Sequence, residues 1–221
     1  MTSLDAPQLI TVNRVRTKIC GVRSVADARA AAAAGADAVG LVFAAASKRR
    51  ITAAQGAEIA AALPPFVSRV ALFMDNDPDE IARILATVAI DVIQFHGAES
   101  ADFCNAFDRP YIKAVPMGEP GVKLTDWAER HPRATAFLLD ANRVGEAGGQ
   151  GRAFDWQATV AAIDRPIVIA GGLTPGNVGA AIARFAPYAV DVSSGVESEP
   201  GVKCSERMRV FVNTVTEMGK A

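Results

Sequence analysis

Short apolar runs alternate along the chain with longer segments in which apolar residues recur at helical spacing. Runs of roughly four to eight apolar residues are typical of buried strands, whereas a spacing of about three to four residues is typical of helices. The pattern predicts eight strands, over residues 15–20, 37–43, 67–73, 91–95, 111–115, 135–139, 166–170 and 188–192. It also predicts eight helices, over residues 24–35, 52–63, 78–88, 100–107, 122–130, 154–163, 174–185 and 205–218.

Residues that start and stop helices support these limits. Ser24 can cap the first helix, with Asp27 three residues later as a variant of the capping box. Pro64 would stop the second helix, and Pro78 suits the first turn of the third. A Gly-rich segment, residues 145–151, follows the sixth strand and precedes the next predicted helix.

The alternation of strands and helices predicts the fold class. Strands separated by helices favour a parallel sheet, and eight such units close a (β/α)₈ barrel. An open doubly wound sheet is the alternative, but no Gly-x-Gly-x-x-Gly motif follows the first strand. We therefore expect one α/β TIM-barrel domain over residues 1–221, in which residues 1–13 form a polar leader.

Composition narrows the class of protein further. Half of the residues are hydrophobic and the net charge is only -1, which favours a folded domain with a large core. The pI near 6.1 gives no electrostatic signature of nucleic-acid binding. No apolar run approaches the roughly 20 residues of a membrane helix, and residues 1–12 lack the pattern of an export signal. We expect neither a nucleic-acid nor a membrane partner.

Cysteine and histidine usage bears on redox state and metals. The three cysteines, Cys20, Cys104 and Cys204, are widely spaced and odd in number. This arrangement favours free thiols in a reducing cytoplasm over a disulfide framework. With only two histidines, His96 and His131, far apart in the sequence, we expect no metal site.

Two reactive groups fall where strands are predicted to end. Side chains alternate along a strand, so Lys18 and Cys20 share the face that points into a barrel. Asp140 follows the sixth strand, across the barrel mouth from Cys20. A thiol opposite a carboxyl group suits a base and an acid acting on one substrate. The alternatives are that Cys20 is an inert core residue and Asp140 a loop cap.

The loops after the seventh and eighth strands are candidates for phosphate binding. Glycines allow close approach of an anion to the backbone, and a helix predicted to open at Thr174 would attract negative charge. These two loops recur as a phosphate site in barrels, although ordinary tight turns are the alternative for each. The residues expected to contact phosphate are Gly171, Gly172, Ser193, Ser194 and Gly195.

Further polar residues at the mouth are candidates for substrate contacts. Arg49 belongs to a basic cluster typical of a protein surface, but at the mouth it could bind a substrate carboxylate bidentately. Gln94 and His96 end the fourth strand, and His96 could be a ligand, a proton carrier or a plain hydrogen-bonding residue. Lys18 and Asp191 lie on strands that become neighbours when the barrel closes, so we expect a buried ion pair. Arg49, Gln94, His96 and Asp191 are the expected substrate-binding residues.

Motifs typical of one enzyme family are present at these strand ends. They are Lys18-Ile19-Cys20-Gly21, Gly35-Ala36-Asp37-Ala38-Val39-Gly40, Gln94-Phe95-His96-Gly97, Leu138-Leu139-Asp140, Gly148-Gly149-Gln150-Gly151 with Phe154-Asp155-Trp156, Ala170-Gly171-Gly172-Leu173, and Asp191-Val192-Ser193-Ser194-Gly195-Val196-Glu197. Together they resemble the phosphoribosylanthranilate isomerase family. The resemblance extends from about Arg16 to the last helix, and its first and last motifs are highly specific.

The resemblance implies an enzyme of tryptophan biosynthesis that needs no cofactor. Such enzymes convert N-(5-phosphoribosyl)anthranilate to 1-(2-carboxyphenylamino)-1-deoxyribulose 5-phosphate by an Amadori rearrangement. The family's general base and general acid fall on Cys20 and Asp140, and its anthranilate-binding arginine falls on Arg49. The expected partner is this small phosphosugar, and we expect a monomer or a homodimer.

The chain departs from the family pattern at two places. Ala44-Ala45-Ala46-Ser47 stands where the family often has Tyr-Pro-x-Ser, and Cys204 stands where an aspartate usually follows Pro-Gly-x-Lys. Both departures concern loop packing, not the candidate base or acid.

Other phosphate-binding barrels are the nearest alternatives. The related isomerase of histidine biosynthesis has an aspartate in place of Cys20, and indoleglycerol-phosphate synthase relies on a lysine and glutamates that have no counterpart identified here. A catalytically silent phosphosugar-binding barrel is an alternative of another class. The paired presence of Cys20 and Asp140 argues against it, because a binding protein has no need of an acid and a base.

Overall fold

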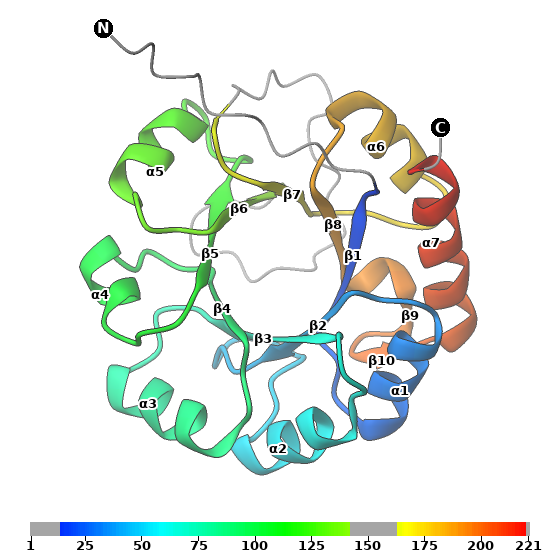
Figure 1. The fold of residues 1–221 in the computed structure, drawn as a ribbon, viewed down its shortest axis with the longest axis horizontal. Coiled ribbons are helices and arrows are strands. Elements are labelled where there is room, and N and C mark those ends of the chain that lie inside the picture. Colours follow the sequence, from blue (N-terminus) through cyan, green and yellow to red (C-terminus); the bar gives the residue numbers. More distant parts are fainter. Residues whose placement is uncertain (1–13, 142–162, 220–221) are drawn as a thin grey trace, which may run out of the picture.

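Eight parallel strands close into a barrel, and helices pack around its outside (Figure 1). The computed structural model describes residues 14–141 and 163–219. Each strand pairs with the next along the chain, and the first strand pairs with the eighth to complete the ring. The predicted (β/α)₈ TIM barrel is therefore confirmed.

The barrel strands lie within one residue of their predicted limits at each end. They are β1 (Arg16–Cys20), β2 (Ala38–Val42), β3 (Ser68–Phe73), β4 (Val92–Phe95), β5 (Tyr111–Pro116), β6 (Ala136–Asp140), β7 (Ile167–Ile169) and β8 (Ala189–Val192). The helices of the described ranges are α1 (Val25–Ala33), α2 (Ala53–Ala62), α3 (Pro78–Thr87), α4 (Ala101–Asn105), α5 (Leu124–Arg130), α6 (Val178–Phe185) and α7 (Ser205–Met218). The apolar runs thus identified the strands because each is buried on both faces.

Helix caps account for several of these limits. The Ser24 hydroxyl accepts a hydrogen bond from the Asp27 backbone N–H at 3.0 Å, which confirms the predicted cap of α1. Thr52 and Gln55 form a complete capping box at the start of α2. Such caps satisfy backbone N–H groups that the first turn of a helix leaves without partners.

The predicted start of α6 at Thr174 is wrong. The helix begins at Val178, because the side chain of Asn177 holds the preceding residues in a turn. Its Oδ1 accepts from the Thr174 N–H at 2.7 Å, and its Nδ2 donates to the Gly172 carbonyl at 3.0 Å. An Asn side chain can replace backbone partners in this way, which favours a turn over a helix.

A small hairpin between β8 and α7 was not predicted. It follows a single 3₁₀ turn, η1 (Ser194–Val196), and consists of β9 (Glu197–Glu199) and β10 (Val202–Lys203) in an antiparallel pair. Both strands are too short to produce an alternating apolar pattern. The hairpin lies beside α1 and α7 on the outside of the barrel (Figure 1).

Three sequence predictions fall outside the described residues. They are the leader over residues 1–13, the Gly-rich segment 145–151, and the helix over residues 154–163 except for its last residue. Within residues 14–141 and 163–219, no helix is both long enough and apolar enough to cross a membrane.

In the part of the chain that the structure describes, buried apolar side chains form three clusters. The largest joins strand residues such as Ile19 and Phe73 to helix residues such as Ile59 and Phe211, so it fills the layer between barrel and helices. Two smaller clusters lie inside the barrel. One comprises Ala114, Ala136, Leu138, Val168, Ala170 and Ala189. The other contains Cys20 with Val42, Ala44 and Leu72. Cys20 therefore points inward, as strand alternation predicted.

The departure at Cys204 has a consequence for stability. Cys204 is the N-cap of α7 and makes no side-chain capping hydrogen bond, although its extended backbone is that of a normal N-cap. We expect Cys204→Asp to stabilise the fold by about 1 kcal/mol, because a carboxylate there accepts from the first-turn N–H groups and favours the helix dipole. Thermal unfolding should show a midpoint roughly 2–4 °C higher. A Cys204→Ala variant provides the control, and an equal gain in both variants would contradict a capping effect.

Candidate active site

A cavity of about 260 Å³ opens at the carboxyl ends of the barrel strands. Residues from the ends of β1, β6 and β8 and from the loops after β2, β4 and β7 line it. The predicted site residues among them are Cys20, Arg49, Gln94, His96, Asp140, Gly171, Gly172, Asp191, Ser193 and Ser194. Gly195 is the one predicted site residue that does not belong to the lining. The structure thus brings together residues that are up to 174 positions apart, from Cys20 to Ser194.

Cys20, the last residue of β1, lies in the wall of this cavity and is 5% exposed. Gly40 on β2 leaves room for the thiol, because a Cβ atom there would lie 2.7 Å from Sγ. Burial raises the pKa of Cys20 above its usual value, and Asp191 acts in the same direction, whereas Lys18 and Lys203 oppose the rise. The resting thiol is therefore mostly protonated at neutral pH.

Lys18 and Asp191 form the buried ion pair expected from the closure of the barrel. The two residues are directly opposite in the β1–β8 register, and Nζ lies 2.7 Å from Oδ1. Burial by itself lowers the pKa of Lys18, but attraction to Asp191 outweighs it and the net shift is upward. Lys18 is thus a permanent positive charge two residues from the candidate base Cys20.

Asp140, the last residue of β6, is linked to two residues at the end of β4. His96 Nε2 lies 3.1 Å from Asp140 Oδ2, and His96 Nδ1 lies 2.9 Å from the Gln94 amide nitrogen. All three side chains line the cavity. With the amide nitrogen as donor to Nδ1, the ring proton is on Nε2 and points at the Asp140 carboxyl group. His96 is therefore a hydrogen-bonding partner of Asp140.

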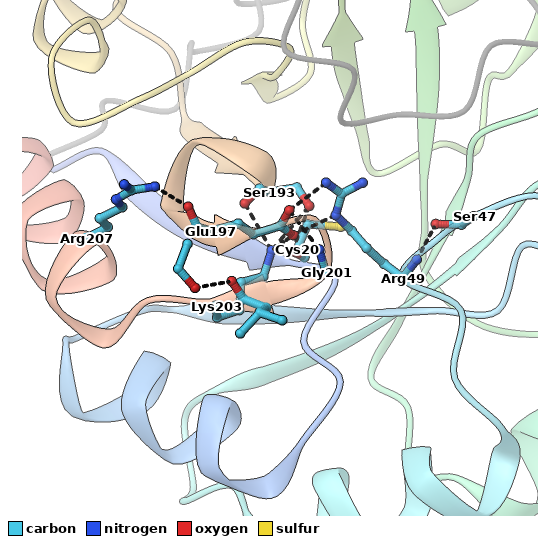
Figure 2. Close-up of polar contacts among 10 residues, drawn as sticks. Cys20, Ser47, Arg49, Ser193, Glu197, Gly201, Lys203 and Arg207 are labelled. Carbon is cyan, nitrogen blue, oxygen red and sulfur yellow. Dashed lines mark hydrogen bonds and ion pairs between the residues drawn. The ribbon is translucent and has the colours of Figure 1, made fainter.

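Arg49 is buried, contrary to the usual place of a residue in a basic cluster. Its Nε and Nη2 atoms donate to the two carboxylate oxygens of Glu197 at 2.7 and 2.8 Å (Figure 2). The sequence predicted a bidentate contact between Arg49 and a substrate carboxylate, but did not predict this internal carboxylate partner. Although burial raises the pKa of Glu197, hydrogen bonds from Arg49 and Lys203 lower it to about 2.

The two glycine- and serine-containing loops lie against each other. Gly171 and Gly172 have φ values of 84° and 64°, the left-handed region that glycine adopts readily. Gly195 packs so closely on the Leu173 carbonyl that a Cβ atom would overlap it. This close contact explains a glycine at position 195 by packing, while Ser193 beside it lines the cavity.

The cavity also has an apolar wall that the sequence did not identify. It is formed by Val42, Ala44, Leu72 and Met74, which pack together with Cys20. In a sequence, such apolar residues cannot be distinguished from those that fill the interior of a barrel, so nothing identifies them as part of a site. Their apolar surface suits contact with an aromatic ring. Among the described residues, no group of three or more His, Cys, Asp or Glu side chains is arranged to hold a metal ion.

The loop after β2 departs from the family pattern at Ala44–Ala46, but its own hydrogen bonds stabilise it. The Ser47 N–H donates to the Ala44 carbonyl, and the Ser47 hydroxyl accepts from the Arg49 N–H, both at 3.1 Å. The turn that presents Arg49 is therefore closed by its own hydrogen bonds.

A closed parallel barrel with a thiol and a carboxyl group facing one cavity at its carboxyl ends belongs to the (β/α)₈ barrel enzymes. Over residues 17–214 the chain matches the family described as N-(5'phosphoribosyl)anthranilate (PRA) isomerase. An N-(5'-phosphoribosyl)anthranilate isomerase of Pseudomonas aeruginosa (strain UCBPP-PA14) is 50% identical over 201 residues, which cover 91% of this chain and 95% of that protein. One from Alcanivorax borkumensis is 47% identical, with 93% and 97% covered.

Solved structures of isomerases of this family are similar to this chain in fold. Phosphoribosyl anthranilate isomerase from Thermus thermophilus aligns with a TM-score of 0.81 and 38% identity, over 92% of this chain and 99% of that one. A phosphoribosyl anthranilate isomerase in complex with reduced 1-(o-carboxyphenylamino)-1-deoxyribulose 5-phosphate aligns with a TM-score of 0.75 and 35% identity, over the same shares. The chain belongs to the N-(5'-phosphoribosyl)anthranilate isomerase family, and it is an isomerase of tryptophan biosynthesis.

Proposed function

We propose that the enzyme isomerises N-(5-phosphoribosyl)anthranilate to 1-(2-carboxyphenylamino)-1-deoxyribulose 5-phosphate with Cys20 as general base and Asp140 as general acid. The observation that carries this proposal is that the two side chains line one cavity from different parts of the barrel, the ends of β1 and β6. An Amadori rearrangement requires one proton to be given and another to be taken at neighbouring positions of a sugar. A facing acid and base fit that requirement.

Asp140 starts the reaction by opening the furanose ring. Its carboxyl proton passes to the ring oxygen as the bond between that oxygen and C1 breaks, while the anthranilate nitrogen forms a double bond to C1. The products of this step are a protonated Schiff base, a free C4 hydroxyl and the Asp140 carboxylate. The hydrogen bond from His96, at 3.1 Å, holds the carboxyl group in a fixed orientation.

Cys20 completes the rearrangement as a thiolate. It removes the proton from C2, and the electrons of that C–H bond form the C1=C2 double bond of a neutral enolamine. The enolamine becomes the ketone when C1 gains a proton and the C2 hydroxyl loses one. The positive charge of Lys18 favours the thiolate, because it opposes the effect of burial on the pKa of Cys20. Solvent exchange then returns a proton to Asp140 and removes one from Cys20.

The ends of the substrate are held apart by different loops. Phosphate lies between Gly171-Gly172 and Ser193-Ser194, two loops that are close together because Gly195 packs on the Leu173 carbonyl. The anthranilate ring packs on the apolar wall, with its carboxylate toward Arg49. The related isomerase solved with a reduced product analogue has a compound of this shape as its ligand.

The activity is tested by loss of the anthranilate-type fluorescence when purified protein is mixed with freshly made substrate. Growth of a tryptophan-requiring strain that lacks this isomerase, after introduction of the gene, provides an independent test. Neither result is expected from a barrel that only binds phosphosugars. Failure of both would overturn the proposal.

Arg49→Ala should raise KM for the substrate by about 10- to 100-fold with a smaller effect on kcat, because a charge-assisted contact to the anthranilate carboxylate is lost. Binding of ribose 5-phosphate, which lacks that carboxylate, should be nearly unchanged. The two affinities can be measured by inhibition and by calorimetry. Equal weakening of both ligands would mean that Arg49 acts only as a diffuse charge.

We further infer a cytoplasmic enzyme that acts as a monomer or a homodimer on this small phosphosugar. A thiol base requires a reducing compartment, since a disulfide at Cys20 would remove it. Cys20, Cys104 and Cys204 are all free. For one solved relative, from Thermotoga maritima, the dimeric isomerase has been converted to monomers.

A further inference from the structure

Glu197 is the centre of a buried ionic cluster beside the cavity. It is the first residue of β9 and is 5% exposed. Its carboxylate accepts two hydrogen bonds from Arg49, one from Lys203 Nζ at 2.8 Å, and one from the Gly201 N–H at 3.1 Å. Four donors therefore converge on one carboxylate (Figure 2).

Lys203 extends this cluster to the loop after β8. Its Nζ donates to the Ser193 carbonyl at 3.0 Å and to the Ser193 hydroxyl at 3.3 Å. The same hydroxyl donates to the Cys20 carbonyl at 3.0 Å. A continuous set of contacts therefore joins Arg49, Glu197, Lys203, Ser193 and the end of β1 (Figure 2).

The charges of the cluster make the carboxylate indispensable to its geometry. Lys203 and Arg49 are both mostly buried and both positive, and Glu197 is the carboxylate that they share. A bidentate carboxylate fixes the plane of a guanidinium group, which a single hydrogen bond does not. Without the negative charge, two buried cations would repel each other, and the loops that carry them would move apart.

We propose that Glu197 is a positioning residue for both ends of the substrate: it aligns Arg49 with the anthranilate carboxylate and, through Lys203, holds the Ser193 loop on the phosphate. This inference rests on the proposed function, which gives those tasks to Arg49 and to the loop after β8. Glu197 does not line the cavity. It therefore acts through its neighbours and transfers no proton.

The principal test is Glu197→Gln, which keeps the size of the side chain and removes its charge. We expect KM to rise by about 10- to 100-fold while kcat falls much less, because the reacting groups Cys20 and Asp140 are unchanged. Affinities for anthranilate and for inorganic phosphate, measured separately by calorimetry, should both fall.

A double-mutant cycle identifies the route of the effect. In an Arg49→Ala background, Glu197→Gln should add little to the loss of anthranilate affinity but should still weaken phosphate binding. Lys203→Met should weaken phosphate binding and leave anthranilate binding nearly unchanged. Glu197→Asp keeps the charge on a shorter side chain, so it should recover thermal stability more fully than KM.

Two further variants keep the test decisive if Glu197→Gln folds poorly. Combining Glu197→Gln with Lys203→Met removes one negative and one positive charge, so the net charge of the cluster is that of the wild type. The affinity for anthranilate can then be measured in a protein without an additional unpaired cation. Val212→Ala, in the core face of α7, destabilises the fold away from the cavity and should keep the wild-type KM.

The proposal is overturned if Glu197→Gln binds both probes as wild-type protein does, or changes KM no more than Val212→Ala. It is also overturned if the loss of anthranilate affinity is undiminished in the Arg49→Ala background. Failure of the proposed function would look different, because the wild-type protein would then not consume the substrate, whatever the ligand affinities of the Glu197 variants.

Discussion

Cys20→Ala is expected to lower kcat by at least about 10²- to 10⁴-fold while the protein remains folded, because the proposed mechanism uses Cys20 to remove the C2 proton. The side chain removed is small and lies at the cavity wall, so the barrel should tolerate its loss. Turnover is measured by the fluorescence assay, and folding by circular dichroism and thermal unfolding. A variant with near wild-type kcat would refute the role of Cys20.

The other two cysteines provide matched controls. Cys104 is fully buried in the layer between barrel and helices, where burial raises its pKa to about 12. Cys204 stands at the start of α7. Cys104→Ala and Cys204→Ala should keep the wild-type kcat, so loss of activity would be specific to position 20.

The pH dependence gives a second measurement of the same role. Because burial and Asp191 raise the pKa of Cys20 more than Lys18 and Lys203 lower it, the thiolate fraction increases with pH beyond the neutral range. The value of kcat/KM should therefore rise with increasing pH as the thiol ionises, which is measured by recording kcat/KM over a range of pH.

Asp140→Asn is expected to lower kcat by about 10²- to 10⁴-fold and to change KM far less, because the proposed donation of its proton to the ring oxygen belongs to the transition state. The amide keeps the size of the side chain and an oxygen that can accept from His96, so the geometry of the pair should persist. If the loss appears only in KM, Asp140 is a binding residue and the acid must be sought elsewhere.

Asp91→Asn makes the same chemical change at the opposite end of the barrel. Asp91 precedes β4 and pairs with Arg69 at 2.8 Å, away from the carboxyl ends of the strands. We expect its kcat to equal that of the wild type. A comparable loss in both variants would indicate a general effect on the barrel.

The sequence predicted most of the fold because a parallel barrel buries each strand on both faces. It also predicted the Lys18–Asp191 pair, since two charges on neighbouring buried strands require each other. The start of α6 was missed because one side chain, that of Asn177, replaces the first helical turn with a hydrogen-bonded turn. This turn leaves the spacing of the apolar residues unchanged, so the sequence pattern did not show that the helix begins later.

The site was predictable where residues stand at strand ends or in the loops that follow them. Cys20, Asp140 and Ser193 have such positions, so topology alone brings them to one mouth. Glu197 is in a short hairpin and meets Arg49 across 148 positions of sequence. Neither periodicity nor spacing carries information on a contact of that kind.

The closure of the barrel through β1 and β8 also determines when the enzyme can become active during its synthesis. Lys18 leaves the ribosome 173 residues before Asp191, which at roughly 5–20 residues per second is an interval on the order of 10 to 30 seconds. During that interval Lys18 lacks its partner carboxylate, and β1, which carries Cys20, has one unpaired edge. The nascent chain therefore contains Asp140 before the loops after β7 and β8, and completes the pocket only when β8 emerges.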